Sequence, residues 1–135
     1  MTYLLDTHII IWTLFEPDRL SSEIKQILEN DTDLKAVSGI SLWEISLKYS
    51  LGKLELSELN PDQVLEAIRE SGFEILELSS ELMASYYQLP KKEDHRDPFD
   101  RMLVWQSIAM GYTLISHDSK IKQYVPSGLR LITNV

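Results

Sequence analysis

The chain contains no cysteine and no long hydrophobic run. Without cysteine it cannot form disulfides, Cys-ligated zinc sites, iron–sulfur clusters or a thiol nucleophile. The absence also agrees with a reducing cytoplasm, which is the location we expect. The longest apolar run near the N-terminus, residues 9–12, is too short to span a bilayer, and no basic segment precedes an apolar one as in a signal peptide. We therefore expect neither export nor membrane insertion.

Positive charge is also scarce. The sequence has 13 lysines and arginines against 21 aspartates and glutamates, which gives a formal charge of −8. The field of such a protein disfavours non-specific binding to nucleic acid and favours cations and basic partners. A nucleic-acid function would therefore need a local site that contains bound metal.

The length of 135 residues and the 44% apolar content are typical of one globular domain, which we assign to residues 1–135. Short apolar runs alternate along the chain with segments of helical periodicity. This alternation predicts a parallel sheet with helices on both faces. The predicted strands are residues 3–5, 34–38, 73–78, 113–116 and 130–132, and the predicted helices are residues 21–30, 41–51, 60–72, 80–88 and 97–109. The strand at 73–78 alternates apolar residues with glutamate, which is typical of a half-exposed strand near an edge.

Four acidic residues lie at or just beyond the predicted carboxyl ends of strands, where open parallel sheets bind ligands. Asp6 directly follows the first strand, and Glu44 lies one turn into the helix after the second. Asp100 is in the first turn of the helix at 97–109, and Asp118 follows the strand at 113–116. The predicted topology brings all four to one edge of the sheet.

Each acid also has an ordinary structural interpretation. Glu44 could complete a capping box with Ser41. Asp100 lies where the helix dipole favours an acid, and Asp118 could be a turn residue. Asp6 is harder to explain in this way, because a carboxylate beside a buried strand is costly unless it is paired or binds a metal.

Converging carboxylates without basic partners repel one another, and their pKa values rise. A hard divalent cation such as Mg²⁺ or Mn²⁺ removes this repulsion and prefers oxygen ligands. Such an ion supports phosphodiester cleavage, because it lowers the pKa of a bound water and neutralises charge on the phosphate oxygens. The predicted chemistry is metal-assisted hydrolysis, which needs no side-chain nucleophile.

Four segments together resemble the PIN domain, and the closest resemblance is to VapC-type toxins, also described as PilT N-terminus-like. They are LLDTH at residues 4–8, WEI at 43–45, DPFDRMLV at 97–104 and LISHD at 114–118. The likeness covers nearly the whole chain in the expected order. Each segment alone is weak, but the first and third together are quite specific.

This resemblance implies a three-layer α/β/α sandwich with a central, mainly parallel sheet. It also implies a Mg²⁺- or Mn²⁺-dependent endoribonuclease, the toxin of a type II toxin–antitoxin system, which forms homodimers and binds a VapB-like antitoxin. Direct attack by water would leave a 5′-phosphate on the cleaved RNA. The acidic quartet that would bind the metal and catalyse cleavage corresponds to Asp6, Glu44, Asp100 and Asp118.

Residues around this quartet have predicted supporting roles. The resemblance places small hydroxyl residues at Thr7 and Ser116, which would orient waters or carboxylates. Asp97 is a predicted helix N-cap that could also contact the groups around the metal. Candidates for contact with substrate or partner are Lys48, which could instead pair with Glu44, together with Arg96 and Arg101.

The three histidines and three tryptophans receive no role from the resemblance. We expect His8 to be packed, His117 to occupy a turn and His95 to lie in an exposed charged loop. Their irregular spacing does not predict a zinc site. Trp12, Trp43 and Trp105 have apolar neighbours and are expected in the core or in a dimer interface, with base stacking as the alternative for an exposed one.

Two other functions remain open at this point. A phosphatase could use Asp6 as a nucleophile, but haloacid-dehalogenase-like enzymes usually carry a second aspartate two positions later, where this sequence has His8. The chain could also be a non-catalytic module whose acidic cleft binds a basic partner. An unchanged melting temperature on addition of Mg²⁺ or Mn²⁺ would favour this module.

Overall fold

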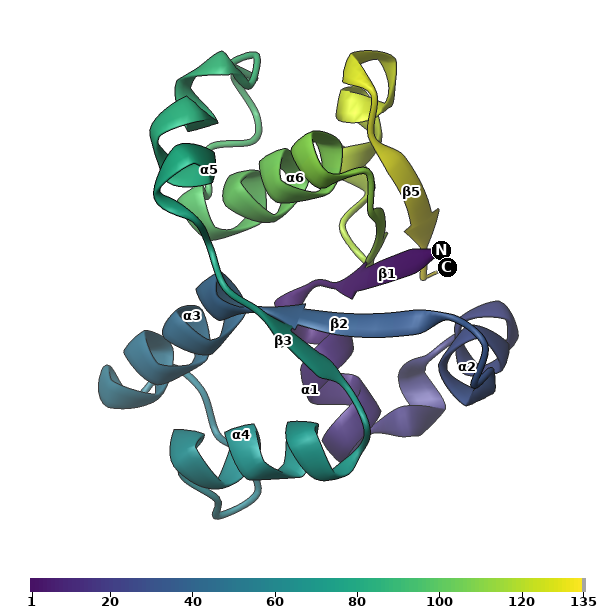
Figure 1. The fold of residues 1–135 in the computed structure, drawn as a ribbon. Helices are drawn as coiled ribbons and strands as arrows, with labels where there is room; N and C mark the ends of the chain where they lie inside the picture. Colours follow the sequence, from purple (N-terminus) through teal and green to yellow (C-terminus); the bar gives the residue numbers. More distant parts are fainter. Residues whose placement is uncertain (135) are drawn as a thin grey trace.

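A computed structural model describes residues 1–134 and shows a five-stranded sheet in which every neighbouring pair of strands is parallel. The strand order is β3-β2-β1-β4-β5 (Figure 1). The strands are β1 (Thr2–Leu5), β2 (Leu34–Ser38), β3 (Glu74–Leu76), β4 (Thr113–Ser116) and β5 (Arg130–Thr133). The α-helices are α1 (Thr7–Phe15), α2 (Ser22–Glu29), α3 (Gly39–Ser50), α4 (Pro61–Glu70), α5 (Ser80–Ser85) and α6 (Pro98–Met110), and the 3₁₀ segments are η1 (Pro17–Arg19), η2 (Tyr86–Gln88) and η3 (Ser119–Ser127).

The sheet separates two hydrophobic cores, because successive strand residues face opposite sides. Leu5 packs in one core with residues of α1, α2 and α4. Leu4, its neighbour, packs in the other core with residues of α6 and η3. In Figure 1, α5 and α6 lie above the sheet and α1, α2 and α4 below it. The predicted three-layer α/β/α architecture is confirmed.

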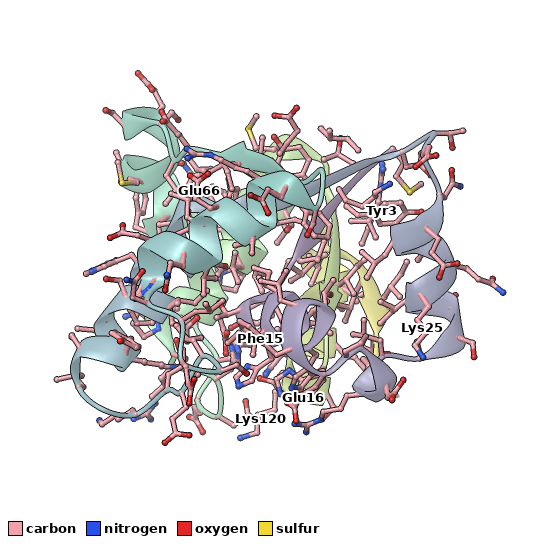
Figure 2. The ribbon with its side chains drawn as sticks, turned by 90° about the horizontal axis from the view of Figure 1, so that it is seen from below. Tyr3, Phe15, Glu16, Lys25, Glu66 and Lys120 are labelled. Carbon is pink, nitrogen blue, oxygen red and sulfur yellow. The ribbon has the colours of Figure 1, made fainter. Side chains whose placement is uncertain are left out.

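Figure 2 shows the lower face of the molecule, where Glu66 marks α4, Phe15 the end of α1 and Lys25 the helix α2. These helices cover the sheet, so both of its faces are buried. Burial on both faces explains why the central strands carry consecutive apolar residues that are all fully buried, Leu4 and Leu5 in β1 and Leu114 and Ile115 in β4.

Local sequence signals determine where two of the helices begin and end. Asn60 and Gln63 form a reciprocal capping box at the start of α4. Asp97 caps α6, and Gly111 ends it with φ +74°, a left-handed conformation that glycine adopts without strain. These boundaries agree with the predicted ones.

Four segments differ from the prediction. Helix α1 was not predicted from the sequence, and neither was the 3₁₀ segment η3. The predicted helix at 80–88 is divided into α5 and η2. The predicted strand at 73–78 is shorter, Glu74–Leu76, but it lies at an edge of the sheet as expected. In the part of the chain that the structure describes, no helix is both long and apolar enough to cross a bilayer.

Candidate active site

Asp6 is buried at the carboxyl end of β1, where it caps helix α1. Its Oδ1 accepts a hydrogen bond from the Ile9 amide at 2.9 Å, and its Oδ2 accepts one from the His117 amide at 3.3 Å. Two backbone donors compensate for the burial of this carboxylate. The second donor ties the end of β1 to the segment that follows β4.

Glu44 reaches the same region from α3 and is also buried. The Thr7 hydroxyl donates to Oε1 at 2.5 Å, and Lys48, one turn further along the helix, forms an ion pair with Oε2. Burial alone would lower the pKa of Lys48, but the hydrogen bond and charge of Glu44 raise it overall. The ion pair that the sequence allowed is therefore formed, and it holds Lys48 beside the acidic residues.

Asp100 experiences the combined charge of the acidic residues. Burial, followed by the charges of Asp97, Asp6, Glu44 and Asp118, raises the pKa of Asp100 to about 7. Asp97 accepts from the Asp100 amide at 3.3 Å as part of the N-cap of α6, so the cap also places a second carboxylate next to Asp100. The charges of the other three predicted acids thus act on Asp100.

Asp118 follows β4 and caps the 3₁₀ segment η3. Its amide donates to Ser116 Oγ at 3.1 Å, and its Oδ1 accepts from the Lys120 amide at 2.9 Å. Its Oδ2 is 3.7 Å from His95 Nε2, which is also 3.9 Å from Asp100 Oδ2. Among the described residues, the possible metal ligands of His95, Asp100 and Asp118 lie within 4.8 Å of one another. Asp6 and Glu44 lie outside this tightest group, with their oxygens already engaged by protein donors.

The donor set of the pocket fits a hard divalent cation. It is rich in carboxylate oxygens, which Mg²⁺ and Mn²⁺ prefer. Burial and the charges of the other acids raise the pKa of Asp100, and a bound cation would relieve the repulsion among these carboxylates. Asp100 and Asp118 are the residues best placed to hold a cation.

Comparison with known proteins agrees with this arrangement. The sequence profile of the PIN domain matches residues 3–125. The chain belongs to the PIN domain family.

Three relatives show how far this similarity extends. The PIN chain is 29% identical over 128 residues to the ribonuclease VapC22 of Mycobacterium tuberculosis, covering 91% of this chain and 92% of that protein. It superposes with a TM-score of 0.73 and 25% identity on the crystal structure of VapBC2 from Rickettsia felis bound to a promoter DNA fragment, covering 100% of both chains. The DNA-bound VapBC of Salmonella typhimurium gives a TM-score of 0.70 at 19% identity, with 98% of each chain covered.

Arg101, which the sequence predicts as a contact for substrate or partner, is held by hydrogen bonds inside this PIN domain. Its side chain is buried, and its guanidinium donates to the hydroxyls of Tyr86 and Tyr124 and to the carbonyls of Leu89 and Pro90. These hydrogen bonds connect the segment that precedes α6 with Tyr124 in η3. Arg96, the other predicted contact on this segment, is exposed and donates to the Glu93 carbonyl.

Two histidines are also placed differently from the prediction. His95 is 4% exposed and does not lie in an exposed loop, because its Nδ1 is hydrogen-bonded to the buried Tyr124. His8 is exposed and not packed in the core, and its ring is 4.4 Å from that of His117. The hydrogen bond and charge of Asp6 raise the pKa of His117, although burial opposes this.

Trp12 is buried in the core, as predicted, and its ring also contacts this histidine pair in the PIN domain. Its ring centroid is 5.0 Å from that of His117, and the guanidinium of Arg19 lies 4.1 Å from it. His8 and Trp12 are four residues apart and so share a face of α1, but helix α1 itself was not predicted.

Proposed function

We propose that this PIN domain is a cytoplasmic Mg²⁺- or Mn²⁺-dependent endoribonuclease, the toxin of a type II toxin–antitoxin system. The observation that carries the proposal is the convergence of Asp6, Glu44 and Asp118 on Asp100, whose pKa rises to about 7. When bound, the cation would lower the pKa of water and neutralise charge on the phosphate. The similarity to the ribonuclease VapC22 supports RNA as the substrate.

The residues around the acids hold them in place. Thr7 and Lys48 fix the two oxygens of Glu44, so this carboxylate cannot turn away from the pocket. Ser116 accepts from the Asp118 amide and thereby shapes the turn after β4. Asp97 begins α6 and so determines where Asp100 lies. We propose that Thr7, Ser116 and Asp97 are positioning residues that act through the acids and do not touch the RNA.

Cations near the acids supply a binding surface for the RNA backbone, although the protein as a whole is acidic. Lys91, Lys92 and Arg96 line a cavity of about 840 Å³ together with the exposed Tyr87, and His95 also lines it. Lysine and arginine pair with phosphates, and tyrosine stacks on bases. We propose that Arg96 contacts the RNA here, and that Lys48 does so at the opposite side of the pocket.

An antitoxin and a second copy of the chain are the proposed protein partners. The similar structures from Rickettsia felis and Salmonella typhimurium are VapBC complexes, which supports a VapB-like antitoxin. Trp43, Leu47 and Leu51 recur every four residues on α3 and its C-cap and are all exposed, Trp43 by 60%. An apolar strip of this kind is typical of a protein interface, and we propose that it is where two copies associate.

The activity is tested by incubating RNA with the wild-type protein and with Asp6→Asn, in Mg²⁺, in Mn²⁺ and in EDTA. We expect cleavage by the wild type with either metal, none in EDTA, and none by the variant, because the amide lacks the charge that the cation requires. Analysis of the product ends should show 5′-phosphates. Equal cleavage by the two proteins would contradict the proposal.

The proposed dimer is tested at Trp43. Trp43→Asp should place a charge in the apolar interface and produce a monomer, whereas the wild type should elute as a dimer in size-exclusion chromatography with light scattering. Met110→Asp provides a matched control, because Met110 is another exposed apolar residue but lies on α6. A wild-type monomer, or a Trp43 variant that remains a dimer, would show that this strip is not the interface.

A further inference from the structure

One ring nitrogen of His95 is bonded inside the protein, and the other is directed at the acids. Nδ1 is 2.7 Å from the Tyr124 hydroxyl oxygen. Nε2 has no hydrogen-bond partner in the described chain, although the side chain is only 3% exposed. A buried polar nitrogen without a partner is destabilising. The arrangement therefore indicates that an acceptor from outside the chain occupies this position.

The hydrogen bonds behind His95 determine which nitrogen carries the hydrogen. Arg101 Nη1 donates to the Tyr124 hydroxyl oxygen at 2.8 Å, and a guanidinium can only donate. His95 Nδ1 is the one acceptor in hydrogen-bond contact with the Tyr124 hydroxyl in the described chain, so Tyr124 donates its own hydrogen to Nδ1. In the neutral ring the remaining hydrogen is then on Nε2. The chain from Arg101 through Tyr124 to His95 thus presents an N–H donor to Asp100 and Asp118.

The distances leave room for a single oxygen atom among these three groups. Nε2 is 3.7 Å from Asp118 Oδ2 and 3.9 Å from Asp100 Oδ2, which is longer than the roughly 2.7–3.2 Å of a direct hydrogen bond. A water molecule could accept from Nε2–H and donate one hydrogen to each carboxylate, which satisfies all three groups. Its remaining lone pair would be free.

We propose that His95 is a positioning residue that holds, through Nε2–H, the water molecule that attacks the RNA phosphodiester. The inference rests on the proposed ribonuclease function. The water oxygen forms a bond to phosphorus, and the bond from phosphorus to the 3′ oxygen breaks, which leaves a 5′-phosphate and a 3′-hydroxyl. One hydrogen of the water passes to the Asp100 carboxylate, and the departing oxygen takes a proton from solvent.

The arrangement is tested first without RNA or metal, by NMR of protein with ¹⁵N-labelled histidine above neutral pH. The ring signals of His95 are those that disappear in His95→Gln, and we expect them to report hydrogen on Nε2. Tyr124→Phe removes the donor to Nδ1 and should produce a mixture of tautomers. Hydrogen on Nδ1 in the wild type would overturn the proposal, because a lone pair would then face the acids.

The role in cleavage is tested by comparing two substitutions with a control. His95→Leu removes the donor, and we expect kcat to fall about 10- to 100-fold with KM nearly unchanged. His95→Gln places an amide N–H close to the position of Nε2 and should retain most of the wild-type kcat. Arg130→Gln is the control, because Arg130 is exposed at the first residue of β5, the opposite end of the sheet from the acids, and its loss should leave kcat unchanged.

The outcomes separate this proposal from the ribonuclease proposal. Suppose that the wild type cleaves RNA. If His95→Leu is then unimpaired, or if His95→Leu and His95→Gln are equally impaired, the proposed role of His95 is overturned and the ribonuclease proposal is not. A wild type that does not cleave RNA with either metal would overturn the ribonuclease proposal, while the tautomer measurement still decides the arrangement. If His95→Leu does not fold, Tyr124→Phe replaces it and should also lower kcat.

Discussion

Asp100→Asn is expected to abolish RNA cleavage and, in the same protein, to increase the stability of the metal-free fold. The loss of activity should be at least about a thousandfold, because the amide cannot neutralise a cation that the proposed chemistry requires. The gain in stability follows from the burial of Asp100 and from the repulsion that the other acids exert on it, which together raise its pKa to about 7. Opposite effects on function and stability are typical of a binding site.

The pH dependence of this gain has a defined sign. The pKa of Asp100 is about 7 in the folded state, against 3.8 for an unperturbed aspartate. The folded state therefore binds more protons between these values, and its stability falls as the pH rises through this range. Above this pH range, the charged form of Asp100 lowers the free energy of unfolding by on the order of 4 kcal/mol at most, and substitution by Asn removes this loss. Asp100→Asn should thus show its largest gain in free energy of unfolding above neutral pH and almost none near pH 4.

Urea denaturation of the metal-free proteins at several pH values measures this gain, and RNA cleavage with Mg²⁺ measures the loss. Asp62→Asn is the matched control, because Asp62 is an exposed acid in the first turn of α4: it should leave cleavage unchanged and lower stability by at most about 1 kcal/mol through the helix dipole. An Asp100 variant that is less stable than the wild type above neutral pH would show that the acids do not repel one another as the structure indicates.

Sequence reasoning predicted most of the fold because the signals for it are local. Capping residues such as Asn60 and Asp97 act within one turn, so they locate a helix start from a few residues. Helix α1 escaped this reasoning. Its sequence is almost wholly apolar, and Ile9, Ile10 and Trp12 are all buried, so no polar face reveals a helical period.

The candidate site was predictable in part for the same reason. The four acids follow strands, and the parallel topology alone places strand ends together. The partners of Arg101 and His95 could not be predicted, because their hydrogen bonds join segments 11 to 29 residues apart that local patterns do not relate. A charged loop suggested exposure for His95, but Tyr124 lies 2.7 Å from its ring and buries it.

The second large effect is expected on adding metal. Mg²⁺ or Mn²⁺ at about 100 times its dissociation constant should stabilise the fold by about 2.7 kcal/mol, which raises Tm by roughly 10 °C for a chain of this length. The shift should be larger above neutral pH than near pH 5, because a cation competes with the proton on Asp100, whose pKa is about 7. Thermal denaturation followed by circular dichroism measures it, with EDTA to reverse it.

Asp6→Asn is the variant that connects this shift to the site. The negative charge of Asp6 acts on Asp100 and adds to the attraction for a cation. Loss of this charge in Asp6→Asn should therefore remove most of the metal-induced shift in Tm, whereas Asp62→Asn should retain the shift in full. An unchanged Tm in the wild type would favour the non-catalytic acidic module over the nuclease. A metal shift that survives in Asp6→Asn would instead favour a cation held by Asp100 and Asp118 alone, the pair that lies closest to His95.

A nucleophilic role for Asp6 has less support, because both of its oxygens already accept backbone hydrogen bonds from Ile9 and His117, and formation of an aspartyl phosphate would break at least one of them.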